Sequence, residues 1–272
     1  MELYYQDSLA EIWNGDSRRL PNLEDDSVDL VLTSPPYWNY GDFGHPDQIG
    51  FGQSYEEFNT DLQAILGECF RCLRPGQRIV TWVADLFGNG RPRVALTADV
   101  HKELQRVGFE FETTIIWHRP KQASAGEEAA TLPPCEQFMG GGPQHLIVYQ
   151  KPGKPPQPSA EVAAASRIPA VFRSRLEDAV WLVPSDGSSP EKDNAGGGAS
   201  EFDEEWSTPE WAVIRFWSAA GDLVLDPFAG TGLFCAAAKS LGRRTIGIEL
   251  NKTTCEAAAE RCRNATPKRS ES

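Results

Sequence analysis

The amino-acid sequence predicts an α/β protein with a doubly wound, mostly parallel sheet. Near the carboxyl end, a strand, a helix and a second strand follow one another over residues 223–248, which is a β-α-β unit. In the first half, short apolar runs alternate with amphipathic helical stretches, as expected for a sheet covered by helices. Apolar residues make up 40% of the 272 positions, enough for a sizeable core.

The first half, residues 1–150, supplies four strands and two helices. Residues 28–33, Val-Asp-Leu-Val-Leu-Thr, are mostly apolar and are typical of a buried strand. Ser34-Pro35-Pro36 must end this strand because proline cannot donate to a sheet ladder. The further elements expected are a helix over 55–73, a strand over 78–83, a helix over 96–107 that Gly108 closes, and strands over 109–118 and 145–149.

The second half, residues 206–272, follows a stretch over 151–205 with fewer helix and strand signals. That stretch is Pro-rich at 150–160 and rich in Ser, Gly and acidic residues at 185–205, which is typical of a linker or insertion. The elements expected after it are a helix from Pro209 capped by Thr208 or Ser207, a strand over 223–225, a helix over 233–241, a strand over 245–248 and a helix over 252–263.

The net charge of −13 is unevenly distributed along the chain. Residues 1–70 carry −12 and residues 176–210 carry −9, whereas residues 71–121 carry +4. A basic middle therefore remains available to face phosphates, although an acidic surface without a nucleic-acid role has the same overall charge. The sequence shows no secretory signal and no apolar run of membrane-spanning length, so we expect a cytoplasmic protein without a membrane partner.

Cysteine spacing does not indicate a metal site. Cys69 and Cys72 form a lone C-x-x-C within a helical stretch, and no second pair or neighbouring histidine completes a zinc site. A spacing of three puts both thiols on one helix face. We expect reduced, structural cysteines and no metal.

Glycines follow the strand at 223–225, in the segment Asp226-Pro227-Phe228-Ala229-Gly230-Thr231-Gly232. Such a bend lets the backbone approach a ligand closely, and Glu249 at the end of the next strand is placed to accept hydrogen bonds from ribose hydroxyls. The competing prediction is a nicotinamide-dinucleotide site. The sequence after Gly232 does not complete the G-x-G-x-x-G pattern that this requires, and glycines that merely permit tight packing remain a third explanation.

Ser34-Pro35-Pro36-Tyr37 lies at the carboxyl end of a predicted strand, where open α/β sheets place ligands. An aromatic amino group is a poor nucleophile because its lone pair is delocalised into the ring. Two acceptors aimed at its hydrogens, the Ser34 hydroxyl and the Pro35 carbonyl, would favour a more tetrahedral nitrogen. Two prolines fix that carbonyl, and Tyr37 offers a face for a flipped base. The alternative is a strand that Pro-Pro simply ends.

Together the two motifs resemble the DNA amino-methyltransferases, which methylate the exocyclic nitrogen of cytosine or adenine. The resemblance covers most of the chain outside residues 151–205. The segments that carry it are Asn14-Gly15-Asp16-Ser17, Ser34 to Trp38, Cys72 to Gly76, Gly108 to Pro120, His145 to Lys151, Asp226 to Gly232, and Gly247 to Leu250. In the family, Ser34 to Tyr37 would be the catalytic motif and Asp226 to Gly232 the cofactor motif. The catalytic motif precedes the cofactor motif here, as in the group of these enzymes called β.

The resemblance implies a Rossmann-like methyltransferase sheet, circularly permuted, with S-adenosyl-L-methionine as cofactor. Residues 1–150 would be the catalytic half, 151–205 a small target-recognition insertion, and 206–272 the cofactor-binding half. The residues it assigns to the cofactor are Asp16, Thr208, Asp226, Pro227, Phe228, Gly230, Gly232 and Glu249. It assigns catalysis to Ser34, Pro35, Pro36 and Tyr37.

A serine in the first catalytic position is usual in family members that act on cytosine. We therefore expect a site-specific enzyme that transfers methyl to cytosine N4 in double-stranded DNA by base flipping, without a covalent intermediate. The alternatives are an N6-adenine DNA methyltransferase, a methyltransferase for RNA or protein glutamine, and a non-catalytic DNA- or nucleoside-binding module. A cognate restriction endonuclease and the choice between monomer and homodimer stay open.

Target recognition is expected outside the sheet, in the loops 38–54 and 119–144 and in residues 151–180. The candidate contacts to phosphate or base are Arg91, Arg93, Arg119, Lys121, Arg173 and Arg175. Carbon-5 cytosine methylation uses a Pro-Cys nucleophile, and the only Pro-Cys here, Pro134-Cys135, has no strand leading into it. We therefore expect no catalytic role for Cys135.

Overall fold

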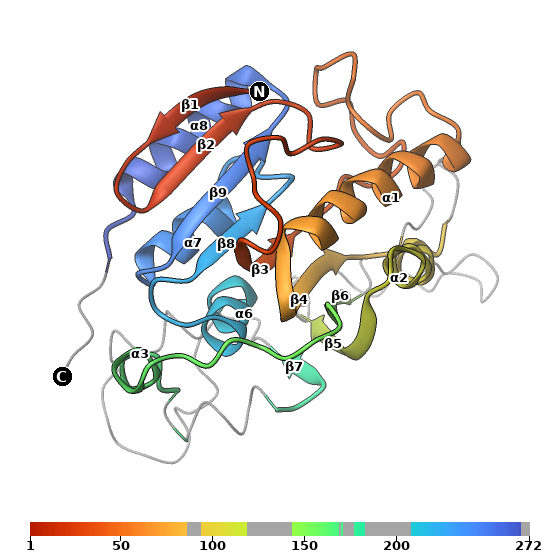
Figure 1. Ribbon diagram of the computed structural model, residues 1–272. Coiled ribbons are helices and arrows are strands. Elements are labelled where there is room, and N and C mark those ends of the chain that lie inside the picture. The colour runs from red at the N-terminus through yellow and green to blue at the C-terminus, as the bar shows by residue number, and fades with distance from the viewer. Residues whose placement is uncertain (86–93, 119–142, 169, 171–176, 183–207, 268–272) are drawn as a thin grey trace, which may run out of the picture.

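The computed structural model describes residues 1–85, 94–118, 143–168, 170, 177–182 and 208–267. Its centre is a nine-stranded sheet in the order β1-β2-β9-β8-β3-β4-β6-β5-β7 (Figure 1). The strands are β1 (Glu2–Gln6), β2 (Ala10–Asn14), β3 (Val28–Thr33), β4 (Leu73–Val83), β5 (Glu110–His118), β6 (Gln144–Gln150), β7 (Val180–Leu182), β8 (Leu223–Asp226) and β9 (Arg244–Glu249).

Most neighbouring strands run parallel, which confirms the predicted fold class. Antiparallel pairing is confined to β1 with β2 at one edge and to β6, which pairs with both β4 and β5. The C-terminal strands β8 and β9 lie between β3 and β2 of the N-terminal half. The two halves of the chain therefore build one continuous sheet, and the carboxyl ends of β2, β3, β8 and β9 meet at one edge.

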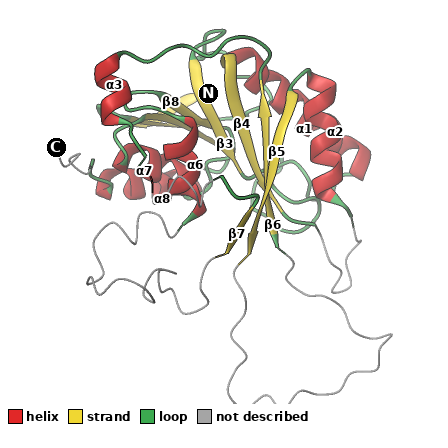
Figure 2. Cartoon of the chain, turned by 90° about the horizontal axis from the view of Figure 1, so that it is seen from below, coloured by secondary structure: helices red, strands yellow, loops and turns green. Residues whose placement is uncertain are grey.

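Helices cover both faces of this sheet (Figure 2). The helices are α1 (Tyr55–Cys72), α2 (Leu96–Val107), α3 (Ala160–Ala165), α6 (Pro209–Trp217), α7 (Leu233–Ser240) and α8 (Lys252–Asn264). One core cluster joins α1 and α2 to the sheet, and others join α6, α7 and α8 to the opposite face. Among the described residues, no helix has the length and apolar character of a membrane span.

The predicted helices and strands are present, with small shifts at their ends. Helix α1 begins at a capping box in which Ser54 and Glu57 satisfy each other's backbone amides, and its thiols Cys69 and Cys72 are buried and free. Strand β4 begins at Leu73, directly after this helix, rather than at residue 78. The reason is that the residue pairs with Val28 of β3 before the bend at Pro75-Gly76.

Three strands were not predicted. β1 and β2 carry mixed polar and apolar residues. β2 joins the sheet by pairing with β9, which lies more than 200 positions away in the sequence. β7 has three residues and pairs with β5. It falls inside the range 151–205, so part of that stretch belongs to the sheet.

Two glycine substitutions are expected to change stability in opposite directions. A Cβ at Gly247 of β9 would lie 2.7 Å from Cys235 Sγ and 2.9 Å from Ala229 Cβ, so Gly247→Ala should lower the free energy of unfolding by about 1–3 kcal/mol. Gly67 lies inside α1 and has nothing within 4 Å of its Cβ direction. Gly67→Ala should therefore stabilise by up to about 1 kcal/mol, and urea unfolding of both variants measures the contrast. Equal effects would contradict the packing described for β9.

Candidate active site

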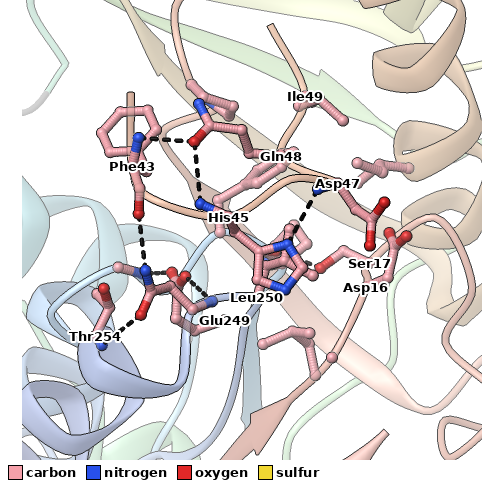
Figure 3. A pocket seen from close by; sticks show the side chains of 18 of the residues that line it. Asp16, Ser17, Phe43, His45, Asp47, Gln48, Ile49, Glu249, Leu250 and Thr254 are labelled. Carbon is pink, nitrogen blue, oxygen red and sulfur yellow. Dashed lines mark hydrogen bonds between the residues drawn. The ribbon is translucent and has the colours of Figure 1, made fainter. Parts of the chain in front are cut away.

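A cavity of about 230 Å³ opens at the sheet edge where β2, β3, β8 and β9 end (Figure 3). It brings together residues from the two ends of the chain. Seven of the predicted site residues line it, namely Asp16, Ser34, Pro36, Pro227, Phe228, Gly230 and Glu249. The catalytic and cofactor motifs therefore share one cavity, as their positions at adjacent strand ends led us to expect.

Glu249 ends β9 and is fixed by main-chain amides. Its Oε2 accepts a hydrogen bond from Gly230 N at 2.9 Å, and its Oε1 accepts one from Asn251 N at 2.8 Å. Burial raises the pKa of this carboxyl above its usual range, while the bonds from these amides oppose that shift. Each oxygen keeps a free lone pair, so the pinned carboxylate can still accept hydrogen bonds from a pair of neighbouring hydroxyls.

Asp16 lies across the cavity from Glu249, just after β2. Burial alone would raise the pKa of its carboxyl, but hydrogen bonds from Arg18 hold that pKa below the ordinary value. The Arg18 Nη2 to Asp16 Oδ2 distance is 2.8 Å. In Figure 3 the imidazole of His45 is drawn between the two carboxylates, where a protonated ring would add to the lowering of the Asp16 pKa and oppose the rise of the Glu249 pKa. The cavity thus has two acidic ends.

Asp226 does not line the cavity but lies beneath it. Its Oδ1 accepts hydrogen bonds from Thr33 Oγ1 at 2.7 Å and from Phe228 N at 3.0 Å, so it ties the end of β3 to the glycine loop after β8. Gly232 is also outside the cavity, at φ +78° in the N-cap of α7, where a Cβ would lie 2.9 Å from Ala258 Cα. Both residues shape the loop from behind.

Burial raises the pKa of Asp226 to about 7, from an ordinary value of 3.8. At a pH between these two pKa values, Asp226 keeps its proton in the folded protein but has released it in the unfolded chain. The contribution of this group to the free energy of unfolding therefore falls as the pH rises from about 4 to about 7. We expect Asp226→Asn to remove that part of the pH dependence, measured as the difference between the two denaturation profiles. Parallel profiles for the two proteins would contradict this.

The catalytic motif is held by the neighbouring strand β4. Ser34 Oγ donates a hydrogen bond to the Trp82 carbonyl at 3.0 Å, so its lone pairs remain available as acceptors. The Tyr37 ring packs edge-on against Tyr40, with ring centroids 6.0 Å apart. Burial raises the Tyr37 pKa, and interactions with the Ser34 side chain and the backbone of Ala84 oppose the shift. Pro35 is buried.

Thr208 is not brought to the cavity. It occupies the N-cap position of α6, as predicted, but its side chain makes no capping hydrogen bond. Its Oγ1 is buried and has no partner among the described residues. The assignment of Thr208 to the cofactor therefore stays a prediction.

The loop after the catalytic motif supplies cavity residues that the sequence analysis missed. Phe43, His45, Gln48 and Ile49 all line the cavity, and Figure 3 shows them above Glu249 and Asp16. From the sequence, the whole loop 38–54 is expected to serve target recognition. The only available signal was its richness in aromatic residues and glycine, because the loop is positioned largely through main-chain hydrogen bonds that no motif reveals.

Several predicted recognition residues fall outside the described residues. These are residues 119–142 of the predicted loop 119–144 and the cations Arg91, Arg93, Arg119, Lys121, Arg173 and Arg175. Cys135, for which no catalytic role is expected, also lies outside them. Within the described part of the chain, no group of three or more His, Cys, Asp or Glu side chains is arranged to hold a metal ion.

Sequence comparison connects this site with known methyltransferases. The type II methyltransferase M.MjaI of Methanocaldococcus jannaschii is 28% identical over 88% of this chain and 86% of its own length. The type II beta methyltransferase M.BslI of Bacillus sp. strain NEB-606 is 27% identical over 91% of this chain. The chain spans only 27% of the length of M.BslI.

Structural comparison and a family model agree with these relatives. The putative DNA modification methylase TTHA0409 of Thermus thermophilus, solved in complex with S-adenosyl-L-methionine, has a TM-score of 0.71 and 30% identity, with 95% of both chains covered. The model for N6/N4 DNA methylases matches residues 28–260, which include both the catalytic motif and the cofactor loop. The chain therefore belongs to the N6/N4 DNA methylase family and is a DNA methyltransferase that uses S-adenosyl-L-methionine.

Proposed function

We propose that this enzyme transfers the methyl group of S-adenosyl-L-methionine to the exocyclic N4 of cytosine in double-stranded DNA. The observation that carries the proposal is the hydrogen bond from Ser34 Oγ to the Trp82 carbonyl. In this bond the hydroxyl proton is donated to the protein, so the Ser34 oxygen can accept a hydrogen bond from the target amino group. The acceptor is thus a serine hydroxyl and not a carboxylate. Family members with serine in this position usually act on cytosine.

The residues that line the cavity suit the chemistry of the proposed cofactor. Glu249, pinned by two main-chain amides, is proposed to accept from the ribose hydroxyls, and Asp16 is proposed to contact the adenosine part. Apolar side chains, Phe228, Ile49 and Leu250 among them, offer walls for a flat base between these acids. The backbone of the loop from Pro227 to Gly230 is proposed to hold the methionine part.

Ser34, Pro35 and Tyr37 are proposed to act on the base. S-Adenosyl-L-methionine supplies an electrophilic methyl group. The Ser34 hydroxyl oxygen and the Pro35 carbonyl would accept the two amino hydrogens and so localise the nitrogen lone pair, while the Tyr37 ring would stack on the flipped base. The nitrogen would form its bond to the methyl carbon as the carbon–sulfur bond breaks, with S-adenosyl-L-homocysteine as the leaving group, and its surplus proton would pass to solvent through one of these acceptors.

A purified-protein assay tests the proposal against its alternatives. Radiolabelled S-adenosyl-L-methionine is incubated with unmethylated duplex DNA, RNA and protein, and the labelled nucleosides are identified after digestion. We expect label in DNA as N4-methylcytosine. Label in N6-methyladenine would replace the base assignment, label in RNA or protein would replace the substrate class, and calorimetric cofactor binding without turnover would indicate a binding module.

We further expect the enzyme to act in the cytoplasm.

The aromatic residues Tyr40, Phe43 and Phe51 of the loop 38–54 are exposed beside the catalytic motif, where duplex DNA would approach. Stacking of bases on such side chains is worth about 1–3 kcal/mol per base, which would offset part of the strong negative charge of this half of the chain.

A further inference from the structure

Two hydrogen bonds, called tethers here, join the loop 38–54 to residues beside the cavity carboxylates, and a third, from Gln53 Nε2 to Asp61 Oδ2 at 2.8 Å, joins it to α1. Arg18 Nη2 donates to the carbonyl of Asp47 at 3.1 Å, and Asn251 Nδ2 donates to the carbonyl of Phe43 at 2.8 Å. The second of these bonds is drawn below Phe43 in Figure 3. Gln48 braces the loop from within. Its Oε1 accepts a hydrogen bond from Phe43 N at 2.7 Å, and its Nε2 donates one to Gly41 O at 3.0 Å.

Arg18 binds the loop and a cavity carboxylate with the same guanidinium. Its Nε lies 2.9 and 3.1 Å from the two carboxylate oxygens of Asp16, and its Nη1 donates to Asp61 of α1 at 3.0 Å. The side chain is 28% exposed. The rigid planar fork of an arginine can satisfy three acceptors in fixed directions, which a lysine ammonium cannot reproduce.

Asn251 performs the matching task at the other end of the cavity. Its main-chain N donates to Glu249 Oε1 at 2.8 Å, while its side-chain Nδ2 binds Phe43 O. Its Oδ1 accepts from Thr253 N at 2.9 Å and thereby caps α8. The two tethers of the loop are therefore the same residues that orient the two cavity carboxylates, Asp16 and Glu249.

We propose that Arg18 and Asn251 are positioning residues for the cofactor. Each aims one carboxylate into the cavity and fixes one side of the loop whose His45, Gln48 and Ile49 form the cavity wall. Cofactor binding would then require little further ordering of the loop or of the acids, and affinity rises when that cost falls. The inference rests on the proposed function, because it takes Asp16 and Glu249 to be cofactor contacts.

Arg18 is tested by cofactor binding and steady-state kinetics of the full chain. We expect Arg18→Gln to weaken calorimetric binding of S-adenosyl-L-methionine about tenfold and to raise its KM similarly, with kcat at saturating cofactor changed less than about twofold. Arg18→Lys should recover only part of the affinity. The matched control is Arg19→Gln, since the neighbouring Arg19 is exposed and should leave binding unchanged.

A double-mutant cycle separates this inference from the assignment of Asp16. If Arg18 acts partly through Asp16, then Arg18→Gln should cost less affinity in an Asp16→Asn background than in the wild type, and the loss that remains measures the loop tether to the Asp47 carbonyl. A fully additive loss would overturn the action through Asp16, and unchanged affinity in Arg18→Gln would overturn the positioning role altogether. Unchanged affinity in Asp16→Asn alone would instead overturn the proposed cofactor contact.

Asn251 requires a substitution that keeps the helix cap. Serine can still accept from the first amides of α8 but has no amide to reach Phe43 O. Asn251→Ser should therefore keep the thermal unfolding midpoint within about 2 °C while weakening cofactor binding several-fold, with kcat at saturating cofactor preserved. Wild-type affinity in a folded Asn251→Ser protein would remove Asn251 from the proposal. Equal losses of stability and affinity would assign it a structural role only.

Discussion

Replacing Ser34 by alanine is expected to lower kcat for DNA methylation by about two to three orders of magnitude, the usual effect of removing one preorganised group that stabilises developing charge. The hydroxyl oxygen is proposed to accept from the target amino group, and its orientation is set by the bond to the Trp82 carbonyl. Because that role concerns the base, cofactor binding should change little. The measurement is labelled methyl transfer to duplex DNA together with calorimetric binding of S-adenosyl-L-methionine.

Two further substitutions make this result interpretable. Tyr37→Ala should also lose most activity, because stacking of a flipped base on an aromatic ring is worth about 1–3 kcal/mol. Cys135→Ala should keep most activity, because no covalent intermediate is proposed. If both Ser34→Ala and Tyr37→Ala retained activity, the proposed mechanism would be wrong. If Cys135→Ala alone abolished it, attack on cytosine carbon-5 would have to be considered.

Replacing Glu249 by glutamine is expected to raise the KM for S-adenosyl-L-methionine by one to two orders of magnitude. A hydrogen bond to a charged group contributes about 1.5–3 kcal/mol, and the substitution removes the charge. It also places an NH2 group against Gly230 N or Asn251 N, both of which need an acceptor. Initial rates over a range of cofactor concentrations, at fixed DNA, measure the effect.

The control for this substitution is Glu256→Gln on the exposed face of α8, which removes the same charge seven positions further on. We expect it to leave the KM within about twofold, since exposed charges interact weakly. An equal rise of KM in both variants would mean that overall charge, not the pinned carboxylate, governs cofactor affinity.

Local pattern was sufficient to predict most of the sheet and its helices. The run from Val28 to Thr33 is buried at every position, and the helix predicted over 252–263 matches α8. β1, β2 and β7 could not be predicted in the same way. Their short, mixed sequences become strands through pairing with distant partners, such as β2 with β9, and single-chain periodicity does not reveal such pairings.

The candidate site was predictable where chemistry concentrates in motifs. Asp16, Ser34 and Glu249 lie at strand ends, and parallel topology brings strand ends together. Asp226 and Gly232 shape the glycine loop after β8 from outside the cavity, because burial and close helix packing, which the sequence does not show, decide where they lie. The loop wall and its tethers Arg18 and Asn251 were missed for a similar reason. They act through main-chain carbonyls, which every residue type possesses.

The most direct test of cytosine N4 methylation uses DNA from cells that express this chain, with the Ser34→Ala variant as the control. Nucleoside mass spectrometry and methylation-sensitive sequencing of the same DNA would report the modified base and its sequence context together. We predict N4-methylcytosine at one recurring sequence, present with the wild-type chain and absent with the variant. N6-methyladenine at a recurring sequence, or no methylated amino group at all, would contradict this account.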